Sequence, residues 1–221
     1  MFEAKGAMCG GSGDLTHVIC VTNRHLAAAA AGLGEDDVDS PAGQEAFLTQ
    51  LRCVAQRKPV AVILREKDLT VDAYRMLARD ALAVCRAADV PCILHTFADV
   101  AAELGADGLH LPLPLLRELA PDVRQTFRVL GASCHSAADV REAAALGCTY
   151  VTVGHIFATD CKKGLPPRGL ACLQDSCAAA GRMKVYAIGG ITRERMTDVL
   201  AAGAAGGCVM SGLMTGHVWR A

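Results

Sequence analysis

The feature that most constrains this chain is a regular alternation of short apolar runs with alanine-rich stretches that carry a helical pattern. The strand candidates, rich in Val, Ile and Leu, are residues 18–23, 60–66, 92–96, 108–112, 128–134, 150–156, 185–190 and 206–212. Helical patterns lie between them, for example at 44–56, 71–88, 137–147 and 192–203. Such alternation is typical of parallel βα units, and eight units close a barrel. An open doubly wound sheet rarely uses eight evenly spaced units, so the sequence predicts an α/β fold, the (β/α)8 TIM barrel.

Both ends of the chain depart from an ideal barrel. Residues 24–43 contain the polar run EDDVDSPAG, which predicts a long first βα loop. After Gly212 only nine residues remain, too few for a full closing helix. We therefore expect a truncated or missing last helix, with the barrel open on that side or covered by a partner subunit, so a homodimer is a candidate. Residues 1–17 are predicted to be an N-terminal extension and 18–221 a single barrel domain.

Composition limits the kinds of partner. The chain is 52% hydrophobic but only 4% aromatic, which suits strands buried on both faces by small branched side chains. A formal net charge of −1 gives no reason to expect nucleic acid or an anionic membrane, and no apolar run reaches the length of a spanning helix. The 11 cysteines lie mostly in apolar stretches without a C-x-x-C pair, and no apolar leader precedes them. We expect a reduced, cytoplasmic chain.

Polar residues gather where the predicted strands end. These positions include Thr22, Arg65, Lys67, His95, His110, Ser133, His135, His155, Gly189, Gly190 and Ser211. In a (β/α)8 barrel the working residues lie at the C-terminal ends of strands and in the loops that follow. This concentration favours an enzyme over an interaction module.

Two of these loops are rich in glycine and follow the last two strands. IGGIT (188–192) and VMSGLM (209–214) each place glycine between a strand and a helix start. Glycine lets a phosphate approach backbone N–H groups, and barrels frequently hold phosphate at these two loops. The alternative is that the glycines only make tight turns, but their joint position favours a phosphate site.

The remaining candidates are basic or can move a proton. Arg65 and Lys67 are two residues apart, so both are predicted to point into the mouth, with Glu66 on the other face. A solvated charge run is the alternative. His155 follows a glycine and precedes the loop from Thr159 to Lys162, and a neutral imidazole can move a proton between two carbons of one substrate. The other histidines each have a structural explanation, and no carboxylate pair accompanies them, so no metal site is expected.

Taken in order, several motifs resemble the thiamine phosphate synthase/TenI family. They are LREKD (64–68), LGADGLHLP (104–112), LGASCHS (130–136), YVTVGHIFATDCKKG (150–164), AIGGIT (187–192) and GAAGGCVMSG (203–212). The resemblance covers roughly residues 60 to 214 and the strand VICVTN. It implies the (β/α)8 barrel and a role in thiamine biosynthesis.

Within that family the chain is more similar to the TenI branch, the thiazole tautomerases. Synthases hold Mg²⁺ on carboxylates after strands three and four, where this chain has Thr96 and Pro114. Tautomerases carry Gly-His where synthases carry Gly-Pro, so their proton carrier corresponds to His155. The resemblance implies aromatisation of a thiazole carboxylate phosphate by a proton shift, with no cofactor and no metal. It further implies phosphate contacts from Gly189, Gly190, Met210 and Ser211, carboxylate contacts from Arg65, Lys67 and Ser133, and ring contacts from Thr159 and Lys162.

Three alternatives remain from the sequence. The chain could couple pyrimidine to thiazole as a thiamine phosphate synthase does, although Thr96 and Pro114 argue against this. It could be a non-catalytic regulator of the TenI type, although His155 argues for catalysis. It could also be a sugar-phosphate isomerase or epimerase with similar glycine loops.

Overall fold

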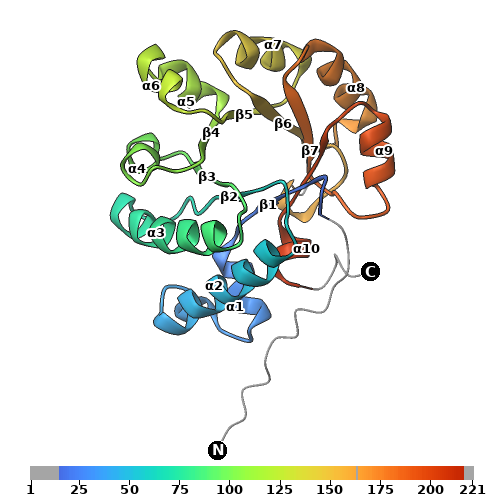
Figure 1. The fold of residues 1–221 in the computed structure, drawn as a ribbon. Coiled ribbons are helices and arrows are strands. Elements are labelled where there is room, and N and C mark those ends of the chain that lie inside the picture. The colour runs from blue at the N-terminus through green and yellow to red at the C-terminus, as the bar shows by residue number, and fades with distance from the viewer. Residues whose placement is uncertain (1–14, 163, 217–221) are drawn as a thin grey trace, which may run out of the picture.

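The computed structural model describes residues 15–162 and 164–216, apart from the side chain of Cys161. Eight parallel strands form a closed barrel in sequence order, as the alternation predicts, and helices surround it (Figure 1). The strands are β1 (Val18–Val21), β2 (Ala61–Leu64), β3 (Cys92–His95), β4 (Gly108–Pro112), β5 (Leu130–Cys134), β6 (Tyr150–Gly154), β7 (Lys184–Ile188) and β8 (Gly206–Val209). The long helices are α2 (Pro41–Gln56), α3 (Val71–Ala87), α7 (Ala137–Ala145) and α8 (Gly169–Ala179). Shorter helices are α1 (Arg24–Ala30), α4 (Ala98–Glu103), α5 (Leu113–Glu118), α6 (Pro121–Thr126), α9 (Met196–Ala201) and α10 (Ser211–Met214), with 3-10 turns η1 (Glu35–Asp37) and η2 (Asp160–Lys162).

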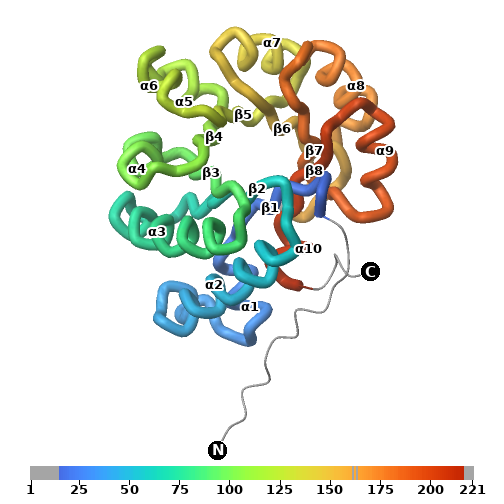
Figure 2. Tube along the Cα trace, in the orientation of Figure 1, coloured from blue at the N-terminus to red at the C-terminus, as the bar shows by residue number. Residues whose placement is uncertain are grey.

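The barrel is closed at the junction of its first and last strands. β1 pairs with β2 on one side and with β8 on the other, with Ile19 opposite Ala61 and Cys208. The sheet is therefore closed on this side. The predicted shortening lies in the helical layer instead, because α10 has only four residues in the described part of the chain. It lies against α1 and α2 (Figure 2).

The first βα connection also differs from the prediction. Residues 24–43 contain α1, η1 and the start of α2 rather than one long polar loop. The side chain of Asn23 accepts a hydrogen bond from the Leu26 N–H at 3.0 Å, which satisfies an orphan donor at the start of α1. Ser40 caps α2 in the same way through the Gly43 N–H.

The core has an inner and an outer part, because successive side chains of each strand point to opposite faces. The inner cluster fills the barrel with Ile19, Val21, Ala61, Ile63, Ile93, Tyr150, Tyr186 and Cys208. The outer cluster packs the other strand faces against the helices and includes Leu15, which is fully buried. Branched and small side chains dominate both, in accord with the low aromatic content.

Two expectations from composition can be compared with the structure. Among residues 15–162 and 164–216, no helix is long and apolar enough to cross a membrane. Eight of the cysteines in the described part of the chain are free thiols, and six of these are buried. Cys53, on α2, is disulfide-bonded, so the expectation that every thiol is reduced is wrong at this position.

Candidate active site

A buried network centred on Glu66 joins the ends of β1 and β2. Thr22 Oγ1 donates to Glu66 Oε1 at 2.6 Å, and the Arg24 backbone N–H donates to Oε2 at 3.1 Å. Thr22 Oγ1 also accepts from the Arg65 N–H at 3.0 Å. Glu66 is only 3% exposed, and burial raises the pKa of its carboxyl while these two hydrogen bonds to it oppose that rise. The network fixes the backbone where β2 reaches the mouth, and it confirms that Glu66 lies on the outer face.

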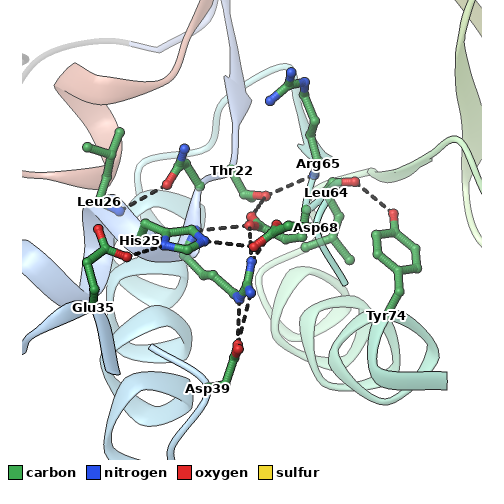
Figure 3. Close-up of polar contacts among 12 residues, drawn as sticks. Thr22, His25, Leu26, Glu35, Asp39, Leu64, Arg65, Asp68 and Tyr74 are labelled. Atoms are coloured by element: carbon green, nitrogen blue, oxygen red, sulfur yellow. Dashed lines mark hydrogen bonds and ion pairs between the residues drawn. The ribbon is translucent and has the colours of Figure 1, made fainter. Parts of the chain in front are cut away.

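A second group of charges ties this network to α1 and η1. Arg24 donates to Asp68 Oδ1 at 2.7 Å and to Asp39 Oδ1 at 3.0 Å. His25 lies between two carboxylates, with Nδ1 2.9 Å from Glu35 and Nε2 2.8 Å from Asp68 (Figure 3). Hydrogen bonds to Asp68 and then Glu35 raise the pKa of His25, and the hydrogen bond from Arg24 lowers the pKa of Asp68. These carboxylates are therefore engaged within the protein.

Predicted basic residues come together at the C-terminal mouth of the barrel. Ile63 belongs to the inner cluster, so alternation directs Arg65 inward, whereas Lys67 lies in the turn that follows β2. Arg65 is half-buried and Lys67 is exposed. Burial lowers the pKa of Lys67, and the positive charges of Arg65 and then Lys162 lower it further. Lys162, in η2 after β6, thus lies within electrostatic range of a residue that follows β2.

A tight turn after β3 sets the orientation of His95. Thr96 has a φ of +75°, which is strained for a β-branched residue, and the Phe97 N–H donates to the His95 carbonyl at 3.0 Å. The Thr96 hydroxyl lies 2.6 Å from His95 Nδ1. Tyr74 donates to the Leu64 carbonyl at 2.7 Å and accepts from the His95 N–H at 2.9 Å, which joins the ends of β2 and β3. Burial first, and then nearby basic groups, lowers the pKa of His95 to about 2.

Strands β4, β5 and β6 contribute a polar group inside the barrel. His110 Nδ1 lies 2.9 Å from the Tyr150 hydroxyl, and its Nε2 lies 2.9 Å from Ser133 Oγ. Burial lowers the pKa of His110 to about 3. The His95 and His110 rings stack with centroids 5.6 Å apart. Gly131 leaves the space for this arrangement, because a Cβ there would lie 2.3 Å from the Tyr150 ring.

His155 follows directly after β6 and is half-buried. Its Nε2 lies 3.3 Å from the carbonyl oxygen of Leu165, in the loop that returns toward α8. The Arg168 N–H donates to the His155 carbonyl at 2.9 Å, and Arg168 Nε donates to the Gly154 carbonyl at 3.0 Å. His135 Nδ1 donates to that same Gly154 carbonyl at 2.7 Å. The backbone that carries His155 is thus held from two sides.

The two glycines after β7 pack against the loop that contains His155. Gly189 and Gly190 have φ values of +92° and +64°, which other residues rarely adopt. A Cβ on Gly189 would lie 2.3 Å from His155 Cβ, and one on Gly190 would lie 2.9 Å from Phe157 Cβ. Arg195 donates to the Gly190 carbonyl at 2.8 Å, and its guanidinium lies 4.7 Å from the Phe157 ring centroid. The predicted phosphate loop and the predicted proton carrier therefore adjoin each other.

The other predicted contacts lie at the same end of the barrel. Met210 and Ser211 follow β8, which pairs with β7, so they neighbour the glycine loop; Met210 is half-buried and Ser211 is exposed. Thr159 is half-buried, and its carbonyl accepts from the Lys162 N–H at 3.1 Å in the turn that forms η2. Ser133 lies near the end of β5, beside the strand that carries His110, and so lies farther along the sheet from the glycine loop. Contact with a ligand stays a prediction for all of these residues.

Comparison with known proteins identifies the family. The model of the TMP-TENI family, described as thiamine monophosphate synthase, matches residues 36–213. The chain belongs to this family. It is 34% identical over 179 residues to thiamine-phosphate synthase of Roseiflexus castenholzii, covering 78% of this chain and 76% of that protein. It is 31% identical over 176 residues to thiamine-phosphate synthase 2 of Streptococcus pneumoniae, covering 77% and 81%.

A solved structure of the thiamine phosphate pyrophosphorylase from Pyrococcus furiosus is similar to this chain in fold. The TM-score is 0.71 at 23% identity, with 95% of this chain and 92% of that chain covered. The predicted barrel and the predicted family are thus confirmed, and so is the connection to thiamine biosynthesis. The TenI branch is not shown, because these relatives are named as synthases, which corresponds to the alternative drawn from the sequence.

Some residues of this candidate site are not predicted from the sequence. The sequence places Tyr150 in an apolar strand and suggests only structural roles for His95 and His110. Arg195 falls in a helix pattern, yet in the structure its side chain donates to the Gly190 carbonyl. The signal available for Tyr150 was Gly131, since an inward glycine on one strand leaves room for a large ring from its neighbour.

Proposed function

We propose that this member of the family acts on a phosphorylated thiazole and catalyses its aromatisation by a proton shift through His155. The observation that carries the proposal is the close packing of His155 against Gly189, since a Cβ on the glycine would lie 2.3 Å from His155 Cβ. A base and an anion-binding loop in contact suit a substrate whose phosphate anchors it beside the reacting carbons.

The hydrogen bond of His155 determines which nitrogen can act as the base. A carbonyl oxygen only accepts hydrogen bonds, so Nε2, 3.3 Å from the Leu165 oxygen, carries the proton of the neutral ring. The lone pair is then on Nδ1, which has no hydrogen-bond partner among the residues that the structure describes. Nδ1 would take a proton from a ring carbon, and the same proton would be returned to the exocyclic carbon as the double bond moves into the ring.

The rest of the mouth offers a second place for negative charge. Arg65 and Lys67 follow the end of β2, and both Arg65 and Lys162 lie within electrostatic range of Lys67. A substrate with a phosphate at one end and a carboxylate at the other would be held between these cations and the glycine loop. General acid–base catalysis by one residue contributes roughly 10²–10⁴-fold, and fixed orientation adds to that factor.

Thiamine phosphate synthesis is the second candidate, because the named relatives are synthases. The resemblance implies Mg²⁺ for that reaction, and Mg²⁺ prefers carboxylate and other hard oxygen ligands. At the two ligand positions the chain has Thr96, whose hydroxyl contacts His95 at 2.6 Å, and Pro114, which has no carboxylate. Nearby Glu66 and Asp68 are bound to Arg24. These residues do not fit the cation, and we derive no step through it.

Proton NMR of the thiazole carboxylate phosphate in D₂O, with the purified full chain, tests the proposal. We expect conversion to the aromatic isomer by the wild type and a loss of at least about 10²-fold in turnover for His155→Ala. His17→Ala is the matched control, since His17 precedes β1 at the opposite end of the barrel and should leave turnover unchanged. Near wild-type turnover in His155→Ala would refute the role of this residue.

A parallel assay separates the two candidates. Pyrimidine pyrophosphate, thiazole phosphate and Mg²⁺ are incubated with the chain, and the coupled product is measured. Product formation without isomerisation would establish the synthase and overturn the proposal. Binding of the thiazole without either reaction would support a regulator instead.

A further inference from the structure

A row of three hydrogen-bonding groups crosses the barrel interior beneath the mouth. Tyr150 on β6, His110 on β4 and Ser133 on β5 are linked by two contacts of 2.9 Å, both made by the His110 ring. Tyr150 and His110 are buried at 4% and 2% exposure, whereas Ser133 is half-buried at the end of its strand. The row therefore runs from the core toward the mouth.

The direction of both hydrogen bonds follows from the chemistry of the three groups. Burial keeps His110 neutral, so its ring has one donor and one acceptor nitrogen. Tyr150 is a buried phenol, and His110 Nδ1 is the acceptor available to it among the described residues. A buried O–H without an acceptor costs about 1–3 kcal/mol, so Tyr150 donates to Nδ1. Nε2 then carries the proton and donates to Ser133 Oγ.

One donor is left over at the end of this row. Ser133 Oγ accepts from His110, so its own O–H is available for a group in the mouth, and the Ser133 side chain forms no other hydrogen bond within residues 15–162 and 164–216. Arg65 and Lys67 lie close enough to His110 to act on its charge. A fixed O–H donor near two cations suits an anionic oxygen acceptor.

We propose that Tyr150 and His110 are positioning residues that hold Ser133 as a hydrogen-bond donor to the substrate carboxylate. The inference rests on the proposed thiazole substrate and adds the basis of selection for its carboxylate. Without the Tyr150 hydroxyl, the hydrogen bond that keeps the His110 proton on Nε2 is lost. His110 can then adopt the tautomer with its proton on Nδ1, and Ser133 donates to Nε2 instead of to the ligand.

The test compares two ligands that differ only in the carboxylate, the thiazole carboxylate phosphate and the thiazole phosphate without it. Calorimetric Kd values are measured for the wild type, Tyr150→Phe and Ser133→Ala, with circular dichroism and thermal melts to verify folding. We expect both variants to weaken binding of the carboxylated ligand by roughly 10–100-fold, which corresponds to one hydrogen bond to a charged group. Affinity for the other ligand should stay within about twofold of the wild type.

Two controls identify a merely structural effect. Tyr186→Phe removes the same atom from the ring that packs edge-on against Tyr150, with centroids 6.1 Å apart, and should change neither Kd. Ser133→Thr keeps the hydroxyl and should keep the preference for the carboxylated ligand, so this arm remains informative if Tyr150→Phe is unstable. Equal weakening of both ligands in Ser133→Ala, or no weakening in either, would overturn the inference. Because the assay measures binding, wild-type turnover by NMR reports separately on the proposed function.

Discussion

Replacement of Thr22 by valine isolates the contribution of the network that joins β1 to β2. The change removes a hydroxyl that donates to the buried Glu66 carboxylate at 2.6 Å and accepts from the Arg65 N–H at 3.0 Å, while the shape of the side chain is kept. A hydrogen bond to a charged group contributes about 1.5–3 kcal/mol, and an unsatisfied buried N–H costs about 1–3 kcal/mol. Burial of the methyl group that replaces the hydroxyl recovers roughly 1 kcal/mol of this loss. We expect a net loss of about 2–4 kcal/mol in the free energy of unfolding.

Urea unfolding followed by circular dichroism measures this loss as a lower midpoint with an unchanged slope. Thr152→Val is the matched control, because Thr152 is also a buried strand threonine but forms no side-chain hydrogen bond within the described residues. A double-mutant cycle with Glu66→Gln isolates the coupling of the two side chains, which we expect to be about 1–2 kcal/mol. A loss below about 0.5 kcal/mol for Thr22→Val, equal to that of the control, would refute the reasoning.

Two further predictions concern pH. His25 has a raised pKa in the folded state, so its contribution to the stability of the fold is complete below about pH 6.5 and is lost as the pH rises through the raised value. The Tm difference between the wild type and His25→Gln should therefore shrink from pH 5.5 to pH 8.5. A constant Tm difference would contradict this. His95 and His110 have lowered pKa values of about 2 and about 3, so each adds stability that is lost as the pH falls below about 6.5. In His110→Asn the slope of unfolding free energy against pH between pH 5.5 and 4 should fall by roughly 1.4 kcal/mol per pH unit, and an unchanged slope would show that this ring is protonated in the folded protein.

The barrel was predictable because its signal is repeated. Each of the eight apolar runs is short and is followed by a helix pattern, so an error at one element does not change the architecture. The connection from residue 24 to residue 43 was missed for a local reason. The alanine run of α1 follows Asn23, whose side chain caps the helix. The polar stretch EDDVDSPAG later in the same segment is typical of a loop, and it led to the prediction of a single loop over all of residues 24–43.

The site was predictable where it depends on local spacing. The inward direction of Arg65 follows from the period of two in a strand, and the place of His155 follows from its position after a strand. The row of Tyr150, His110 and Ser133 could not be found in this way. Its members lie on three strands, and they meet only because the register sets His110 opposite Gly131 and Gly131 opposite Tyr150.

Binding of a phosphorylated thiazole does not distinguish the two reactions considered for this family, since a synthase and a tautomerase would each hold that group. The distinction depends on which ligand can bind at the side of the mouth away from the glycine loop, where Arg65 and Lys67 follow β2. Two acids at the end of β2 are engaged within the protein: Glu66 accepts hydrogen bonds from Thr22 and the Arg24 N–H and pairs with the Arg24 guanidinium, and Asp68 pairs with Arg24 and His25. Arg65 and Lys67 form no ion pair with acids within the described residues, so both charges are available to an anionic ligand. A carboxylate can be held there directly, whereas a pyrophosphate carried by Mg²⁺ would need the acidic ligands that Thr96 and Pro114 replace.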